Sequence, residues 1–229
     1  MKQIRKNKLA LRTIIILLIC TADIGWGAGI LYTSKRNVSV ISVKTASDNI
    51  FGIFLQNLVV SFVPILLFII CLVLLKKQFF SQMYFKIYNK KQTAMITFLI
   101  TVLSALSLYC LITKVDKITV LYNLLYYTLF IALTEEFIVR DVCTYLLREE
   151  KDSIRYLIPN TLFAAMHIFA YAEWGEITVY YLISFALSQM PGLLITGCLF
   201  QYLKEKSGTI WVPILVHAIL DFSVVLSYK

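Results

Sequence analysis

The stretch TEEFIVRD, Thr134–Asp141, places four ionisable side chains inside a run, Ile118–Leu147, that is otherwise almost entirely apolar. At the centre of a membrane-spanning helix such a side chain costs about 3 kcal/mol even on insertion scales, so its presence needs a physical reason. Helical spacing supplies one, because Glu136 and Arg140 are four residues apart with the acid first. That order favours an ion pair along one helix face. We therefore predict that Glu136 pairs with Arg140.

The neighbouring carboxylate, Glu135, points about 100° around the helix from Glu136, because an α-helix has about 3.6 residues per turn. The sequence supplies no cation at the matching position on that face. A carboxylate placed in this way is suited to act as a general base. A structural ion cluster between packed helices explains the same residues equally well, and this stretch alone favours neither interpretation.

The composition of the whole chain is that of a membrane protein, since 59% of its 229 residues are hydrophobic and 15% are charged. Several apolar runs exceed the length of about 18 residues that a membrane span requires. The formal charge of +9 comes from short basic clusters between these runs, which are typical of loops facing anionic lipid. The five cysteines show no Cys-x-x-Cys pair, which indicates neither a disulfide framework nor a metal site. We predict an all-α polytopic transmembrane helical bundle in the lipid bilayer, with no nucleic-acid partner.

Apolar runs and proline positions predict seven spans. Pro64 predicts a kink in the second span, and Pro191-Gly192 a kink or break in the sixth. If that break separates two spans, the total becomes eight. The predicted spans are an apolar run ending near Tyr32, Ile50–Leu75, Thr93–Thr113, Ile118–Leu147, a fifth helix with Pro159 in its first turn, Ile177–Leu203 and Thr209–Ser227.

The distribution of Lys and Arg predicts the orientation in the membrane. With seven spans, the segments on the side of the N-terminus hold fifteen basic residues and the opposite segments hold six. Basic residues favour the cytoplasmic side. We therefore predict a multi-pass protein of the cell membrane with a cytoplasmic N-terminus.

The two histidines of the chain both lie in predicted spans. Phe163 comes four residues before His167, and Asp221 four residues after His217, so each histidine has a companion on its own helix face. An aspartate one turn away can fix the tautomer of an imidazole. A rise of about 1.5 Å per residue places His167, His217 and Glu135 at similar depths in the inner half of the bilayer. That arrangement is typical of a site built between helices.

Three motifs in this order resemble those of the CAAX-protease and bacteriocin-processing (CPBP, or Abi) family of intramembrane proteases, which are related to type II CAAX prenyl endopeptidases. They are Glu-Glu-x-x-x-Arg at Glu135–Arg140, Phe-x-x-x-His at Phe163–His167 and His-x-x-x-Asp at His217–Asp221. The stretch SGTIWVPILVHAILD also resembles the family's approach to its last motif. The resemblance covers about residues 118–227. It implies a catalytic helical core in residues 118–229, preceded by three spans in residues 1–117.

The resemblance also implies an activity, hydrolysis of a peptide bond in a peptide or membrane-protein substrate. Glu135 and His167 would activate the water. His217 and Asp221 would help to hold the oxyanion. Asp221 stands where the prenyl-protease branch typically has Asn, and because a charged Asp cannot donate to an oxyanion, we expect it to orient His217 or to be protonated. The residues that would support the site are Glu136, Arg140 and Phe163.

The same side chains leave the question of a metal open. Glu135, His167 and His217 could form a His₂Glu zinc set with water in the fourth position. The usual His-Glu-x-x-His signature is absent, which favours catalysis without a required metal. The sequence therefore gives no certain cofactor, and a divalent metal such as zinc is the alternative.

Two other classes of protein fit part of the pattern. A non-catalytic immunity or scaffold protein would use the same fold to bind a toxin or sensor partner, but the intact motifs favour a working site. A proton-coupled transporter also places Glu, Asp and His inside the membrane. The sequence shows no internal repeat, which counts against a transporter.

Overall fold

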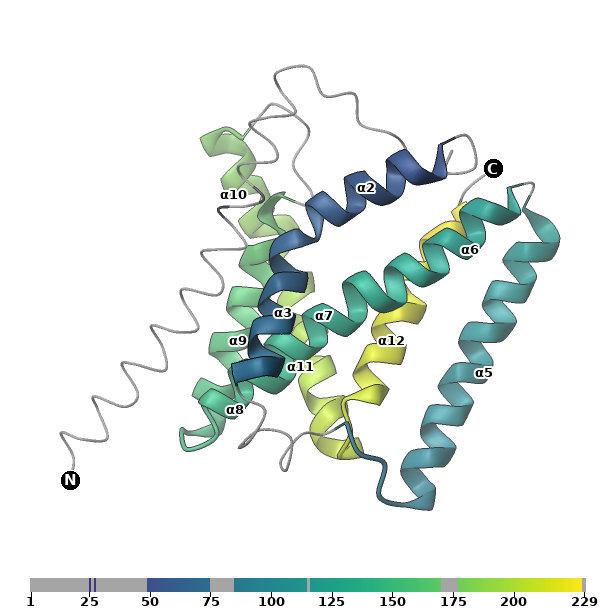
Figure 1. The fold of residues 1–229 in the computed structure, drawn as a ribbon. Coiled ribbons are helices and arrows are strands. Elements are labelled where there is room, and N and C mark those ends of the chain that lie inside the picture. The colour runs from purple at the N-terminus through teal and green to yellow at the C-terminus, as the bar shows by residue number, and fades with distance from the viewer. Residues whose placement is uncertain are drawn as a thin grey trace, which may run out of the picture. The chain divides into compact units, whose positions relative to one another are not determined.

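The structure is a computed structural model that describes residues 49–74, 85–114, 116–169 and 177–227, together with Gly25 and Gly27. Within these residues every regular element is a helix (Figure 1). The predicted all-α architecture is therefore confirmed. The predicted first span lies outside the described residues, apart from the two glycines.

The helices fall into two compact units whose sequences are interleaved. The first unit holds residues 1–39 and 139–199, and the second holds residues 40–138 and 200–229. One boundary falls directly after TEEFI of the TEEFIVRD stretch. The division predicted between residues 117 and 118, which separates N-terminal spans from a catalytic core, stays a prediction.

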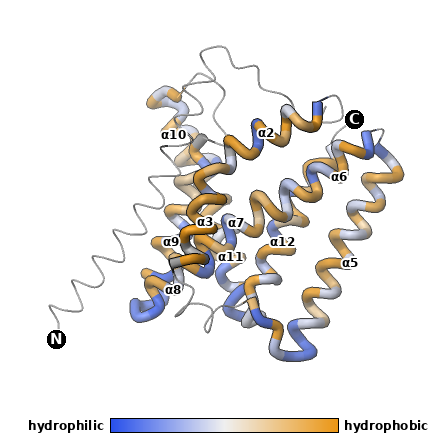
Figure 2. The backbone as a smooth tube through the Cα atoms, viewed as in Figure 1, coloured by the Kyte–Doolittle hydropathy of each residue, from blue (hydrophilic) through white to orange (hydrophobic). Residues whose placement is uncertain are grey.

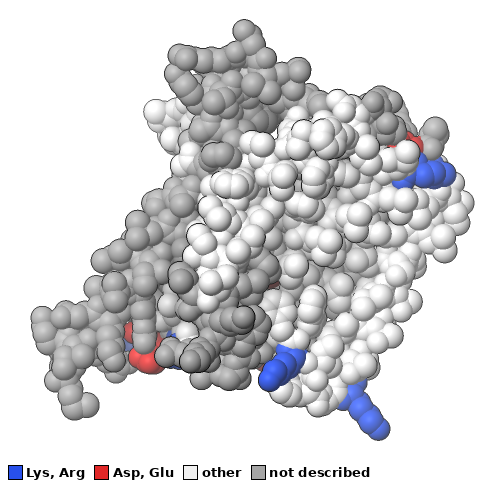
Figure 3. Space-filling view, viewed as in Figure 1, with Lys and Arg blue, Asp and Glu red and all other residues white. Residues whose placement is uncertain are grey.

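Helix α5 (Lys90–Thr113) is long and apolar enough to cross a membrane, as its sequence predicts. Its 24 residues rise about 36 Å, more than the hydrocarbon core of about 30 Å. Lysines flank both ends, and the surface between them is uncharged and apolar (Figures 2 and 3). Large apolar side chains on it are open, with Phe98 67% and Ile112 71% exposed. This is the surface expected of a helix that faces lipid.

The second candidate span is one helical run from Lys117 to Leu146, close to the predicted fourth span. It is not a uniform α-helix. Two of its segments, η2 and η3, are π-helical, so their hydrogen bonds join residue i to residue i+5. The two glutamates of the TEEFIVRD stretch therefore lie on a single α-helical turn between two π-helical segments. The elements in order are α6 (Lys117–Leu125), η2 (Tyr126–Ala132), α7 (Leu133–Glu136), η3 (Phe137–Cys143) and α8 (Thr144–Leu146).

The predicted second span is broken into α2 (Ile50–Val60) and α3 (Phe62–Leu74). The kink predicted from Pro64 is confirmed, although the break lies three residues earlier, at Ser61. A proline ring clashes with the carbonyl four residues before it, which here is that of Val60, the last residue of α2. Pro64 itself falls in the first turn of α3, where no intrahelical N–H bond is lost.

The predicted sixth span is also broken, into α10 (Val179–Ser188) and α11 (Met190–Ser207), with a bend of 43° between them. The break lies at Gln189, two residues before Pro191. If this pair counts as one span, the described residues hold three candidate spans, and otherwise two. The total of seven or eight spans and the cytoplasmic N-terminus stay predictions.

The fifth helix begins earlier than the sequence predicts. Helix α9 (Asp152–Met166) has Pro159 in its interior, so the placement of Pro159 in the first turn is wrong. The proline removes one backbone hydrogen bond. Beside it, the buried side chain of Asn160 donates Nδ2 to the backbone oxygen of Tyr156 at 2.8 Å. This extra bond to the backbone helps the helix to continue past the proline.

Gly197 of α11 permits a close contact in the first unit. A Cβ at this position would lie 2.7 Å from Oδ1 of Asn160 and 3.3 Å from a guanidinium nitrogen of Arg140, and both side chains are fully buried. We expect Gly197→Ala to lower the free energy of unfolding by about 1–3 kcal/mol, because the buried amide has no space to retreat. Thermal unfolding in detergent measures this. Gly192→Ala is the matched control, since a Cβ at Gly192 would have no atom of another helix or side chain within 4 Å. Equal unfolding temperatures for the two variants would contradict the close packing.

A glycine turn reverses the chain before the last helix. Gly208 has a φ of 70°, a left-handed conformation that favours glycine and ends α11. From the start of α5, Gln92 donates Nε2 to the backbone oxygens of Ser207 at 3.0 Å and Gly208 at 3.2 Å. These bonds hold the turn in place. The elements that follow are α12 (Trp211–Phe222) and the 3₁₀ turn η5 (Ser223–Ser227).

Helix α12 lies at the centre of the second unit, where it packs against α5, α6, η2 and α7. Most of its apolar residues are buried in these contacts. Of its two ionisable residues, His217 is therefore buried between packed helices, whereas Asp221 is partly exposed.

Candidate active site

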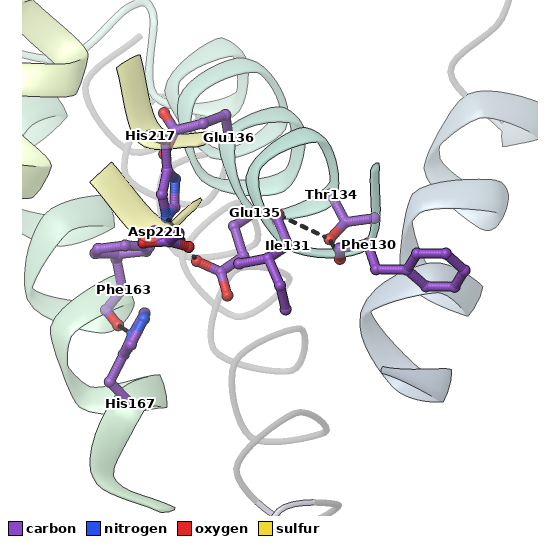
Figure 4. Close-up of polar contacts among 9 residues, drawn as sticks. All are labelled: Phe130, Ile131, Thr134, Glu135, Glu136, Phe163, His167, His217 and Asp221. Carbon is purple, nitrogen blue, oxygen red and sulfur yellow. Dashed lines mark hydrogen bonds and ion pairs between the residues drawn. The ribbon is translucent and has the colours of Figure 1, made fainter. Parts of the chain in front are cut away.

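Four titratable side chains meet in the second unit, where α7 and α12 are in contact (Figure 4). Glu135 and Glu136 come from α7, and His217 and Asp221 from α12. Glu136 and His217 are 81 positions apart in the sequence, so the cluster depends on tertiary packing. The structure thus brings together three of the four residues predicted to be catalytic, and adds Glu136 to them.

The imidazole of His217 has a carboxylate at each of its ring nitrogens. Nδ1 lies 2.9 Å from Oε1 of Glu136. Nε2 lies 3.3 Å from Oδ2 of Asp221 and 3.9 Å from Oε2 of Glu135. Because an ionised carboxylate only accepts hydrogen bonds, a ring protonated on both nitrogens donates to Glu136 on one side and Asp221 on the other.

The two sides of this ring differ in their access to solvent. The Glu136 side chain is 0% exposed and that of His217 7%, whereas Glu135 is 21% and Asp221 30% exposed. A buried carboxylate on Nδ1 fixes the tautomer and orientation of an imidazole. On the Nε2 side, the two carboxylate side chains, Glu135 and Asp221, are partly exposed.

The sequence missed the contact between Glu136 and His217, because spacing identifies partners only along one helix. The predicted pair of Glu136 and Arg140 stays a prediction. It assumes α-helical geometry, but Arg140 lies in the π-helical segment η3, where residues four apart are no longer one turn apart. Arg140 is fully buried, and its guanidinium carbon lies 4.5 Å from the centroid of the Phe163 ring.

His167 belongs to the first unit, at the end of α9 where the 3₁₀ turn η4 (His167–Phe169) begins. Its Nδ1 lies 2.8 Å from the backbone oxygen of Phe163 (Figure 4). A carbonyl only accepts, so Nδ1 carries the proton and the lone pair of the neutral ring is on Nε2. The ring also packs edge-on against that of Phe163, with centroids 4.6 Å apart. The first unit therefore groups Arg140, Phe163 and His167, while the predicted meeting of His167 with Glu135 stays a prediction.

The turn that carries the two glutamates is fixed by Thr134. Its hydroxyl group lies 2.5 Å from the backbone oxygen of Phe130 and 3.1 Å from that of Ile131 (Figure 4). These carbonyls belong to the end of the π-helical segment η2, where the backbone pattern changes to that of an α-helix. π-Helical turns within α-helices are frequent at functional sites.

No pattern in the sequence predicted two aromatic residues that lie beside the cluster. The Phe200 ring stacks on the His217 ring, with centroids 4.9 Å apart and an interplanar angle of 25°. Tyr126, in η2, lies near Glu135 and Asp221. The chain contains 15 Phe and 14 Tyr, so only the three-dimensional arrangement distinguishes these two.

The metal set considered from the sequence, Glu135 with His167 and His217, stays a prediction, since His167 belongs to the first unit and the other two residues to the second. Among the residues that the structure describes, no group of three or more His, Cys, Asp or Glu side chains could hold a metal ion. A ligating imidazole must turn a lone pair towards the metal. Both ring nitrogens of His217 instead face carboxylate oxygens, at 2.9 and 3.3 Å. In this arrangement both ring nitrogens of His217 are held by carboxylates.

We expect chelators at moderate concentration to leave the activity of the purified protein intact, because the zinc signature is missing and the donors face one another. The measurement is cleavage before and after chelation, together with the metal content of the active preparation. Stoichiometric zinc whose removal and return switch the activity off and on would contradict this expectation.

Residues 117–223 match the model of the family described as type II CAAX prenyl endopeptidase, Rce1-like. The match includes both groups of side chains, the four residues around His217 and the group of Arg140, Phe163 and His167. Among curated proteins and solved structures, none matches the chain. The match confirms, over residues 117–223, the resemblance to CAAX proteases that the three motifs indicate.

Proposed function

Because residues 117–223 match the model of the Rce1-like family of type II CAAX prenyl endopeptidases, we propose that the protein is an intramembrane endopeptidase. It hydrolyses a peptide bond in a peptide or membrane-protein substrate with a water molecule activated by side chains. One observation carries this proposal. His217 is held by the buried Glu136 at Nδ1, while its Nε2 faces the partly exposed Glu135.

Peptide hydrolysis requires a base for water, a donor for the developing oxyanion and a proton for the leaving amine. Glu135 takes a proton from the water whose oxygen attacks the carbonyl carbon. Nε2–H of His217 donates to the carbonyl oxygen as it becomes an oxyanion. The C–N bond then breaks, and Glu135 returns its proton to the amine. Two observations support these roles, the 3.9 Å between Glu135 and Nε2 and the partial exposure of Glu135.

The remaining charged side chains act on His217. Glu136 accepts from Nδ1–H at 2.9 Å and stabilises the protonated ring that the oxyanion requires. Asp221, 3.3 Å from Nε2, holds the other edge of the ring before a substrate is bound. This is the first of the two roles expected for Asp221, which stands where the prenyl-protease branch typically has Asn; the other is that Asp221 is protonated.

We assign His167 a role from the family resemblance, as the second residue that activates water. Its hydrogen bond from Nδ1 to the Phe163 carbonyl supports this role, since it leaves the lone pair of the neutral ring on Nε2. An imidazole in that tautomer can accept a proton from water.

As a first substrate to test we propose a prenylated peptide with a CAAX terminus, because the description of the matching family names that class. The test uses purified protein in liposomes with three probes: a farnesylated CAAX peptide, the same peptide without the lipid, and an unrelated single-span peptide. We expect shorter products by mass spectrometry with wild-type protein and none with His217→Ala. If folded wild-type protein cleaves none of the probes, the proposed substrate class is wrong. If His217→Ala cleaves as well as wild type, the proposed active site is wrong.

A further inference from the structure

The face of the His217 ring is covered by a second aromatic ring, that of Phe200. The two centroids lie 4.9 Å apart at an interplanar angle of 25°, which is an offset stack. Phe200 is only 1% exposed, so the contact is shielded from water. Both residues belong to the second unit.

The fold creates this contact through the turn at Gly208. Phe200 lies eight residues before this glycine and His217 nine residues after it, so a chain that reverses there brings the two to a similar height on α11 and α12. The left-handed Gly208 makes the reversal, and the bonds from Gln92 hold it. The stack therefore follows from the position of the turn rather than from a local motif.

The contacts at the ring edge leave one motion open. Glu136 at Nδ1 and Asp221 at Nε2 lie at opposite edges of the His217 ring. Two such contacts define an axis through the ring, and the ring can still tip about that axis. A flat surface against the face of the ring prevents the tipping. Phe200 supplies that surface, and its π face also attracts the protonated imidazole.

We propose that Phe200 is a positioning residue that holds the plane of the His217 ring, so that Nδ1 stays on Glu136 while Nε2 faces Glu135. Its effect on catalysis rests on the proposed peptidase function, but its effect on the ring does not. A plain core residue would need only apolar volume, which leucine also provides. The orientation of an imidazole needs a flat face, which leucine lacks.

The test combines ring NMR with kinetics. The chain has only two histidines, so protein labelled with ¹⁵N-histidine and purified without a histidine tag gives two sets of ring signals, and His167→Gln assigns them. We expect a slowly exchanging Nδ1–H signal for His217 in the wild type. In Phe200→Leu this signal should be lost to exchange, and kcat should fall about tenfold or more with KM little changed, because misplacement affects the chemical step.

Two further variants make the comparison specific. Phe200→Tyr keeps an aromatic face, so it should retain the Nδ1–H signal and most of kcat. Phe185→Leu removes a different buried aromatic ring, one that stacks on Tyr181, and should leave the His217 signal unchanged.

The inference has three ways to fail. A wild-type protein without NMR contacts between the Phe200 and His217 rings would overturn it, even if Phe200→Leu does not fold. A folded Phe200→Leu with unchanged signal and kcat would also overturn it, as would equal losses in Phe185→Leu. If the NMR results are as expected but no preparation cleaves a peptide, the positioning of the ring holds and the proposed function fails.

Discussion

Glu135→Gln is expected to lower peptide cleavage by about 10²-fold or more while the protein accumulates normally. The substitution keeps the size and polarity of the side chain but removes the base that takes a proton from water. Glu135 lies 3.9 Å from Nε2 of His217, and its side chain is 21% exposed. Loss of its charge therefore affects the reaction more than the packing. The measurement is cleavage in membranes, normalised to the amount of folded protein.

Glu205→Gln is the matched control for this substitution. Glu205 is an exposed glutamate of α11 that accepts a hydrogen bond from Gln201 at 2.8 Å, and a glutamine in its place can still accept. We expect this control to cleave at the wild-type rate. If Glu135→Gln also retains near-wild-type specific activity, the catalytic assignment is wrong, and a non-catalytic scaffold that binds a partner becomes the better account.

Glu136→Gln is expected to have the second largest effect, a loss of about 100-fold in cleavage together with less folded protein. Glutamine can still accept a hydrogen bond from Nδ1–H of His217, but it lacks the charge that stabilises the protonated ring. A buried hydrogen bond to a charged group contributes about 1.5–3 kcal/mol, and 2.7 kcal/mol corresponds to about 100-fold in rate. Less protein is expected because the carboxylate is fully buried.

Normalisation to folded protein separates these two effects of Glu136. If Glu136 served only to pair with Arg140, Glu136→Gln would accumulate poorly but cleave normally per folded molecule, as Arg140→Ala would. If it orients His217, the activity per folded molecule also falls. A thermal-unfolding curve for each variant provides the folded fraction, and wild-type specific activity for Glu136→Gln would contradict the role in orienting His217.

The helices were largely predictable because apolar runs and prolines are local signals. The run that became α5 was predicted to within three residues of its start. The breaks expected near Pro64 and Pro191 are present, displaced towards the N-terminus because a proline disturbs the turn before it. Pro159 misled the prediction, since the side chain of Asn160 bonds to the backbone beside it and the helix continues. That compensation depends on a side-chain rotamer, which spacing in the sequence does not show.

The residues of the site were predictable, as was the contact between Asp221 and His217 one turn away, but the contact between Glu136 and His217 was not. Glu135, His217 and Asp221 stand out because ionisable groups are rare in apolar spans. The pairing expected for Glu136 relied on a uniform α-helix, whereas π-helical segments flank its turn and change which residues share a face. Its contact with His217 spans 81 positions. No periodicity identifies a partner at that separation.

The most direct test of the proposed mechanism is hydrolysis in water enriched in ¹⁸O, in membranes from cells that produce either the wild type or Glu135→Gln. Mass spectrometry of new peptide termini reports both the cleaved bonds and the source of the carboxyl oxygen. We expect new peptide termini that carry ¹⁸O in wild-type membranes, in amounts that fall by about 10²-fold with Glu135→Gln. Equal sets of termini at equal amounts of folded protein would contradict it.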